Sequence, residues 1–123
     1  MTIVKGFLWL LAAFDVGYGL FALLAPERAA GGVGLQLADA GAHGEIRAIY
    51  GGMMLAMGVV TAGALVWNRP DWLLALGLVW CGLVLGRVVS VIADGPARLT
   101  LVIGAVEAIS AVTMILYGRT GQT

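Results

Sequence analysis

The chain has 123 residues, of which 61% are hydrophobic and only 11% are charged, and its formal net charge is zero. Soluble domains average about 45–50% apolar and about 25% charged residues, so this composition is typical of a protein that folds in lipid. A neutral chain offers no electrostatic basis for binding nucleic acid, and we expect no such partner. The length allows one domain, which we expect to be all-α and to cover residues 1–123.

The first apolar run covers residues 3–24, and Pro26 follows it. Because Asp15 interrupts the run and no small-residue cleavage pattern follows, we interpret it as a retained helix rather than a signal peptide. Its length fits the roughly 20 apolar residues that cross a membrane. The long connection at residues 25–44 has two interpretations. It is either a flexible loop or an ordered cap across the mouth of the bundle, since long connections often act as lids.

Three further apolar runs cover residues 45–67, 72–93 and 97–117. None of them alternates with a period of two, and each is too long for a strand, so we expect helices. Short turns at residues 68–71 and 94–96 join these helices in sequence. The pattern therefore predicts an integral membrane four-helix bundle with four transmembrane helices.

Four spans place both termini on the same side of the membrane. The basic residues are divided equally between the two sides: Lys5, Arg69 and Arg119 lie on the side of the termini, and Arg28, Arg47 and Arg98 lie on the other. If Arg47 is drawn into the bundle, the side of the termini carries more positive charge. The positive-inside rule then favours cytoplasmic termini.

Ionisable residues interrupt the apolar runs at similar depths. Asp15, Arg87 and Glu107 lie roughly 14, 10 and 15 Å from the side opposite the termini, at a rise of 1.5 Å per residue. A charge at the bilayer centre costs about 2.5–3.5 kcal/mol on insertion scales, so such groups usually pair or line a wet cavity. We predict one polar pocket, open to that side only. Its predicted lining comprises Asp15, Glu45, Arg47, Tyr50, Arg87, Ser90 and Glu107.

The predicted pocket holds three acids and two arginines. The simplest arrangement has two ion pairs and leaves one protonatable acid, which we expect to be Asp15 or Glu107 because they lie deepest. The alternative is purely structural, since a buried pair such as Arg87–Glu107 can simply fix how helices pack. Both interpretations predict that Arg87 meets an acidic partner.

Other signals for chemistry are absent from the sequence. Cys81 is a lone cysteine within an apolar run, and His43 is a lone histidine for which we expect a solvated position in the connection. One cysteine and one histidine do not make a metal site, and we expect neither metal nor cofactor. A match to the dinucleotide fingerprint at residues 17–22 lies in mid-helix with no strand before it, so we reject it.

Two motifs carry a resemblance to a known family. They are Glu45-Ile-Arg-Ala-Ile-Tyr-Gly-Gly52 and Gly86-Arg-Val-Val-Ser-Val-Ile-Ala-Asp-Gly-Pro96, and the mid-helix Glu107 follows them. Together they resemble domain of unknown function 4345, a family of small bacterial membrane proteins distantly similar to the DoxX-like group. The resemblance implies a four-span fold and a location in the bacterial cytoplasmic (inner) membrane. It implies seven motif residues, Glu45, Arg47, Tyr50, Arg87, Ser90, Asp94 and Glu107, and no particular activity.

Three functions remain open from the sequence. The first is a non-enzymatic membrane protein that binds a small or lipidic ligand in the polar pocket, or acts as an accessory subunit of a larger membrane complex or homo-oligomer. The second is a small proton-coupled transporter in which Asp15 or Glu107 carries the proton. The third, an intramembrane enzyme acting on lipid, ranks last because no activating base or metal accompanies the carboxylates.

Overall fold

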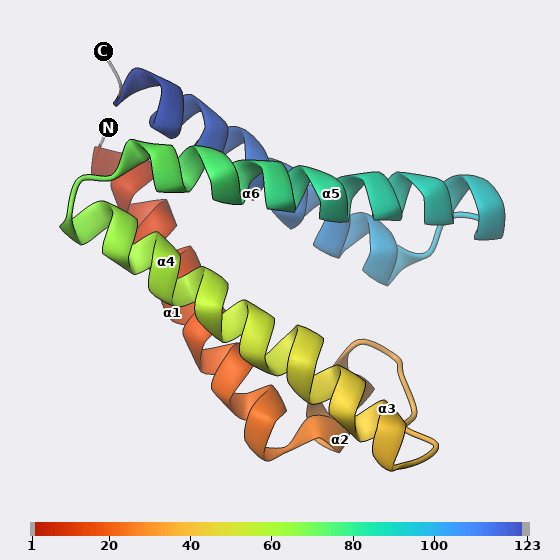
Figure 1. The fold of residues 1–123 in the computed structure, drawn as a ribbon. Helices are drawn as coiled ribbons and strands as arrows, with labels where there is room; N and C mark the ends of the chain where they lie inside the picture. Colours follow the sequence, from red (N-terminus) through yellow and green to blue (C-terminus); the bar gives the residue numbers. More distant parts are fainter. Residues whose placement is uncertain (1, 122–123) are drawn as a thin grey trace. The chain divides into compact units, whose positions relative to one another are not determined.

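The computed structural model describes residues 2–121, and within them it consists of helices joined by short connections (Figure 1). The elements in order are α1 (Thr2–Leu24), α2 (Pro26–Gly32), α3 (Ala40–Ile46), the π-helical segment η1 (Arg47–Met53), α4 (Met54–Val66), α5 (Pro70–Asp94) and α6 (Arg98–Thr120). The segments α3, η1 and α4 continue into one another as a single 27-residue helix, Ala40–Val66. The described residues contain no strand, so the predicted all-α class is confirmed.

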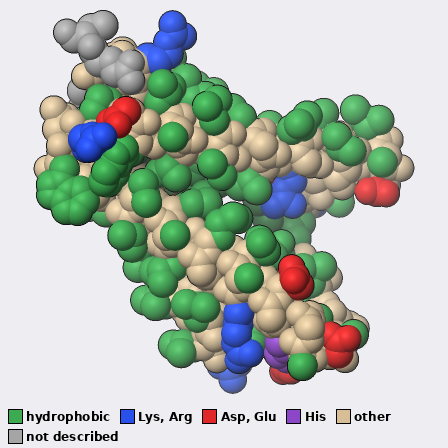
Figure 2. Space-filling view, in the orientation of Figure 1, with side chains coloured by type: hydrophobic (Ala, Val, Ile, Leu, Met, Phe, Trp, Pro, Cys, Tyr) green, Lys and Arg blue, Asp and Glu red, His purple; other side chains and the backbone are tan. Residues whose placement is uncertain are grey.

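Four of these helices are long and apolar enough to cross a membrane: Thr2–Leu24, Ala40–Val66, Pro70–Asp94 and Arg98–Thr120. Their outer surfaces carry many large apolar side chains, which appear green in Figure 2. Leu78 is 65% exposed and Ile92 is 80% exposed, for example. Continuous apolar surface of this kind is unfavourable in water and is the normal lipid-facing surface of a membrane helix. The chain is therefore an integral membrane protein.

The chain forms two compact units. The connection unit is Trp9–Ala62 and contains most of α1, the long connection, η1 and most of α4. The hairpin unit is Met1–Leu8 with Gly63–Thr123 and contains α5 and α6. The packing of all four long helices into one domain stays a prediction.

In the connection unit, α1 and α4 approach each other at glycines (Figure 1). A Cβ atom placed on Gly19 would lie 2.6 Å from the backbone nitrogen of Leu55. One placed on Gly58 would lie 2.8 Å from the carbonyl oxygen of Ala12. No side chain fits at either position without movement of the backbone. Small residues at such contacts let membrane helices pack where no hydrophobic effect drives their association.

The long connection contains the short helix α2 and the start of α3, whereas its position across the mouth of the bundle stays a prediction. Its first half forms α2, in which Pro26, Ala29 and Ala30 are buried. The hydroxyl of Tyr18 on α1 donates a hydrogen bond to the carbonyl oxygen of Ala29 at 2.9 Å. Its second half enters α3 through Asp39, whose carboxylate accepts a hydrogen bond from the backbone N–H of Ala42 at 2.8 Å.

In the hairpin unit, α5 and α6 run antiparallel and are joined at Gly95, whose φ of 90° suits a residue without a side chain. The helices touch closely near their other ends. A Cβ placed on Gly77 would lie 2.7 Å from Cγ1 of Ile115, and one placed on Gly118 would lie 2.9 Å from the backbone nitrogen of Leu74. Buried side chains of this unit include Leu73, Leu76, Trp80, Ala111 and Met114.

Candidate functional site

The main polar contact of the hairpin unit joins Arg87 on α5 to Glu107 on α6. The Nε of Arg87 donates to Oε2 of Glu107 at 3.0 Å, and Nη2 donates to Oε1 at 2.9 Å. The side chain of Glu107 is 8% exposed, whereas that of Arg87 is 36% exposed. Two parallel charge-assisted hydrogen bonds fix the plane of the guanidinium group as well as its position. The buried acid therefore holds a partly exposed arginine in a defined orientation.

The stem of Arg87 lies beside Gly104 of α6. A Cβ placed on Gly104 would lie 3.4 Å from Cγ of Arg87 and 3.5 Å from its Cβ. The aliphatic stem of Arg87 therefore lies against the bare backbone of α6, one turn before Glu107. Both distances are ordinary van der Waals contacts, so alanine would also fit beside the arginine stem.

A groove of about 360 Å³ runs along α5 and α6 beside this ion pair. Its walls are almost entirely apolar and come from both helices. They include Val84, Arg87, Val88 and Val91 of α5, and Thr100, Leu101, Gly104 and Ala105 of α6. The volume lies within the range of about 300–1,000 Å³ that is usual for small-molecule pockets. The groove thus combines apolar walls with one oriented guanidinium group.

Two more motif residues lie one and two turns beyond Arg87 on α5. The hydroxyl of Ser90 donates to Oδ2 of Asp94 at 3.4 Å, a long hydrogen bond at the exposed end of the helix. Ser90 is half-buried and Asp94 is exposed. Their order along one stripe follows the predicted spacing, and they continue the polar face from Arg87 to the turn at Gly95.

Asp15 is the most unusual side chain of the connection unit. It is fully buried, and neither of its carboxylate oxygens has a hydrogen-bond partner among the described residues. Nearly all buried polar groups in native proteins are satisfied, and an exception needs an explanation such as a proton, a water or an ion. Asp15 belongs to a different unit from Arg87 and Glu107, so their predicted convergence in one pocket stays a prediction.

The first family motif lies at the start of the second long helix, where the backbone is π-helical over Arg47–Met53. π-Helical turns are rare and are frequent at functional sites. Arg47 is exposed here, and its Nε donates to the carbonyl oxygen of Leu23 at the end of α1, at 3.1 Å. Tyr50 is half-buried and Glu45 is exposed. Among residues 2–121 Arg47 makes no ion pair, in contrast to the simple arrangement with two pairs.

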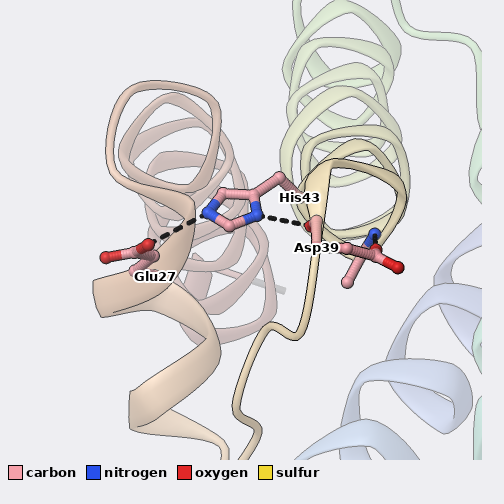
Figure 3. Close-up of polar contacts among 4 residues, drawn as sticks. Glu27, Asp39 and His43 are labelled. Carbon is pink, nitrogen blue, oxygen red and sulfur yellow. Dashed lines mark hydrogen bonds and ion pairs between the residues drawn. The ribbon is translucent and has the colours of Figure 1, made fainter.

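His43 joins the two halves of the long connection, although its sequence position indicated only a solvated side chain (Figure 3). Its Nε2 lies 3.0 Å from Oε1 of Glu27 on α2, and its Nδ1 lies 2.7 Å from the carbonyl oxygen of Asp39. Both partners are hydrogen-bond acceptors, so only the protonated ring donates to both. We name this contact the histidine clip. Sequence reasoning missed Glu27 because 16 residues separate it from His43.

The described residues hold no group of three or more His, Cys, Asp or Glu side chains that could bind a metal ion. Comparison with curated proteins and with solved structures finds no match. The sequence model of a family described as a domain of unknown function, DUF4345, matches residues 3–117, which include every motif residue discussed above. The chain therefore belongs to the DUF4345 family.

Proposed function

We propose that this protein binds a lipidic ligand along the α5–α6 groove and that Arg87 contacts the polar group of that ligand. The observation that carries the proposal is the paired hydrogen bond from Arg87 to the buried Glu107, at 3.0 and 2.9 Å, beside apolar walls. Ligand sites typically combine such walls with a few fixed polar groups. Arg87, held in place by the buried Glu107, is such a group.

The charges favour a ligand with an anionic or carbonyl oxygen. The guanidinium group of Arg87 is partly exposed and lines the groove, and its rigid fork of N–H donors suits such oxygens. The carboxylate neutralises the charge of the guanidinium, so a polar but uncharged oxygen is also acceptable. The apolar walls formed by Val88, Val91 and Leu101 suit hydrocarbon chains rather than a soluble metabolite. The lipid would then enter from the bilayer itself.

Native mass spectrometry of the full chain, released from a mild detergent, tests this proposal. Ala105→Phe places a ring in the groove, and Val106→Phe adds the same ring at an exposed position outside it. We expect the wild type and Val106→Phe to retain a lipidic ligand and Ala105→Phe to lose it. Equal retention by all three proteins, or no retained ligand in the wild type, would contradict the proposal. The same spectra report oligomers or accessory partners.

A second candidate function is proton-coupled transport through Asp15. Its full burial with no hydrogen-bond donor for either oxygen favours this possibility. An unsolvated carboxylate is costly in such surroundings, whereas a neutral acid is less so, and a change between the two states would move a proton. Proton flux in proteoliposomes is the assay. Flux that Asp15→Asn or Glu107→Gln abolishes would support transport, and absence of flux in the wild type would reject it.

We also propose that the protein resides in the bacterial cytoplasmic membrane with both termini in the cytoplasm. The support is the distribution of arginine and lysine between the ends of the helices. Labelling of single cysteines placed near the termini, by a reagent that does not cross the membrane, is the measurement. If the reagent labels these positions in intact cells, the termini lie outside the cell and the proposed orientation is wrong.

A further inference from the structure

A second cavity, of about 320 Å³, lies in the connection unit where α1 ends and α2 begins. Its lining includes Leu24, Pro26, Glu27, Arg28, His43 and Arg47. We propose that this junction cavity binds a phosphate group. In Figure 2, basic, acidic and histidine side chains gather at the end of this unit formed by α2 and α3. The inference is independent of the proposed groove, which is made by the hairpin unit alone.

The two arginines of the junction cavity are available to a ligand. Arg47 donates from Nε to the carbonyl oxygen of Leu23, and its terminal NH₂ groups have no acceptor among the described residues. Arg28 is exposed and has no hydrogen bond or ion pair within residues 2–121. Guanidinium groups bind phosphate through paired, charge-assisted hydrogen bonds, so two of them in one cavity form a suitable receptor.

The acid in the junction cavity offsets at most one of these two positive charges. Glu27 accepts a hydrogen bond from His43 at 3.0 Å in the histidine clip. When His43 is protonated, the clip is neutral as a pair, and the positive charges of Arg28 and Arg47 remain. The clip also connects α2 to α3, so Arg28 and Arg47 both line the same cavity.

The position of the junction cavity along the chain fits a phosphate at the membrane surface. The apolar run of α1 ends at Leu24, and Leu24 itself lines the cavity beside the arginines. Apolar and cationic side chains thus meet where a helix leaves the hydrocarbon region. A phosphate there can belong to a phospholipid head group or to a soluble phosphorylated compound. Both sources present the same oxygens to the arginines, and the experiment separates them.

The test uses the full chain, stripped of lipid in a non-ionic detergent, and native mass spectrometry of added lipids. The probes are a phosphatidic acid and a diacylglycerol with the same acyl chains, which differ only in the phosphate. Inorganic phosphate, titrated by calorimetry, is the soluble probe. The variant Arg28→Gln/Arg47→Gln removes both cationic groups from the cavity. Arg98→Gln removes one exposed arginine that is not part of the cavity lining.

We expect the wild type to bind phosphatidic acid at least about tenfold more tightly than diacylglycerol, since hydrogen bonds to charged groups carry this much discrimination. The double variant should lose this preference and Arg98→Gln should keep it. If the double variant fails to fold, Arg28→Gln alone replaces it, because that side chain has no hydrogen bond or ion pair to lose within residues 2–121. Its preference should fall severalfold.

Two outcomes separate the possible sources of the phosphate, and the remaining outcomes reject the proposal. Phosphatidic acid binding that depends on the two arginines, without binding of inorganic phosphate, assigns the cavity to a lipid head group. Arginine-dependent binding of inorganic phosphate assigns it to a soluble phosphate compound. Equal binding of the two lipids by the wild type without binding of inorganic phosphate, or equal loss in Arg98→Gln and the double variant, would overturn the phosphate site.

Discussion

Removal of either partner of the Arg87–Glu107 pair should destabilise the hairpin unit, and removal of both should cost less than the sum. Breaking a buried ion pair costs about 3–5 kcal/mol because the remaining charge is left without a partner. The side chain of Arg87 is 36% exposed, so the cost of Glu107→Leu is reduced by screening to about 2 kcal/mol. Arg87→Leu leaves the 8% exposed carboxylate of Glu107 alone, and we expect about 3 kcal/mol.

The double variant Arg87→Leu/Glu107→Leu leaves no unpaired charge. Apolar replacement of both members of a buried pair is often neutral, so we expect a loss of no more than about 2 kcal/mol and a coupling energy of about 3 kcal/mol. The assay is equilibrium unfolding in mixed micelles with increasing SDS, followed by circular dichroism. Additive effects within about 0.5 kcal/mol would refute the reasoning, because they would mean that the two side chains do not stabilise each other.

Three further predictions concern the connection unit. Gly19→Ala should destabilise the α1–α4 contact by about 1–3 kcal/mol through overpacking, because the added atom would lie 2.6 Å from backbone, whereas Gly17→Ala, with no atom within 4 Å, should be neutral in the same unfolding assay. Tyr18→Phe should lose about 1 kcal/mol with the hydrogen bond to Ala29, and unchanged stability would contradict an ordered connection. The thermal unfolding temperature of the wild type should fall once the pH is high enough for His43 to lose its proton, because the neutral ring donates only one of the two hydrogen bonds of the clip. His43→Gln should lack this slope, and an identical slope in the variant would assign it to other groups.

The long helices could be predicted from the sequence because the apolar runs are long and contain no proline. The predicted starts at residues 45 and 72 are nevertheless late. Asp39 caps the second long helix and starts it at Ala40, in a segment too polar to be counted as apolar. The third begins at Pro70, whose missing N–H makes it a favourable first residue of a helix. Local capping chemistry, rather than hydropathy, sets these ends.

The contact face of the second long helix could not be predicted from spacing. Ala48, Gly52 and Ala56 recur at a four-residue spacing that is typical of a packing stripe, but all three residues are exposed. Gly51 and Gly58 contact α1 instead. A π-helical turn takes more residues than an α-helical turn, so η1 rotates the following residues away from the face that a regular helix predicts. Sequence periodicity does not reveal such a turn.

The candidate site was predicted in part. Spacing placed Arg87 and Glu107 at similar depths, and the structure has them paired through two hydrogen bonds. The contact between the Arg87 stem and Gly104, and the histidine clip, both depend on distant segments of the chain, which no local motif encodes. For the same reason, the backbone carbonyl that Arg47 contacts could not be foreseen, since any helix end offers such acceptors.

The most direct test of lipid binding at Arg87 compares the wild type with the Arg87→Leu/Glu107→Leu double variant in native mass spectrometry. The double variant should fold, because it contains no unpaired buried charge, yet it lacks the oriented guanidinium group. We predict that the wild type retains a lipidic ligand and that the folded double variant retains at least about tenfold less. Equal retention by both proteins would contradict the assignment of Arg87 as the polar contact of the groove.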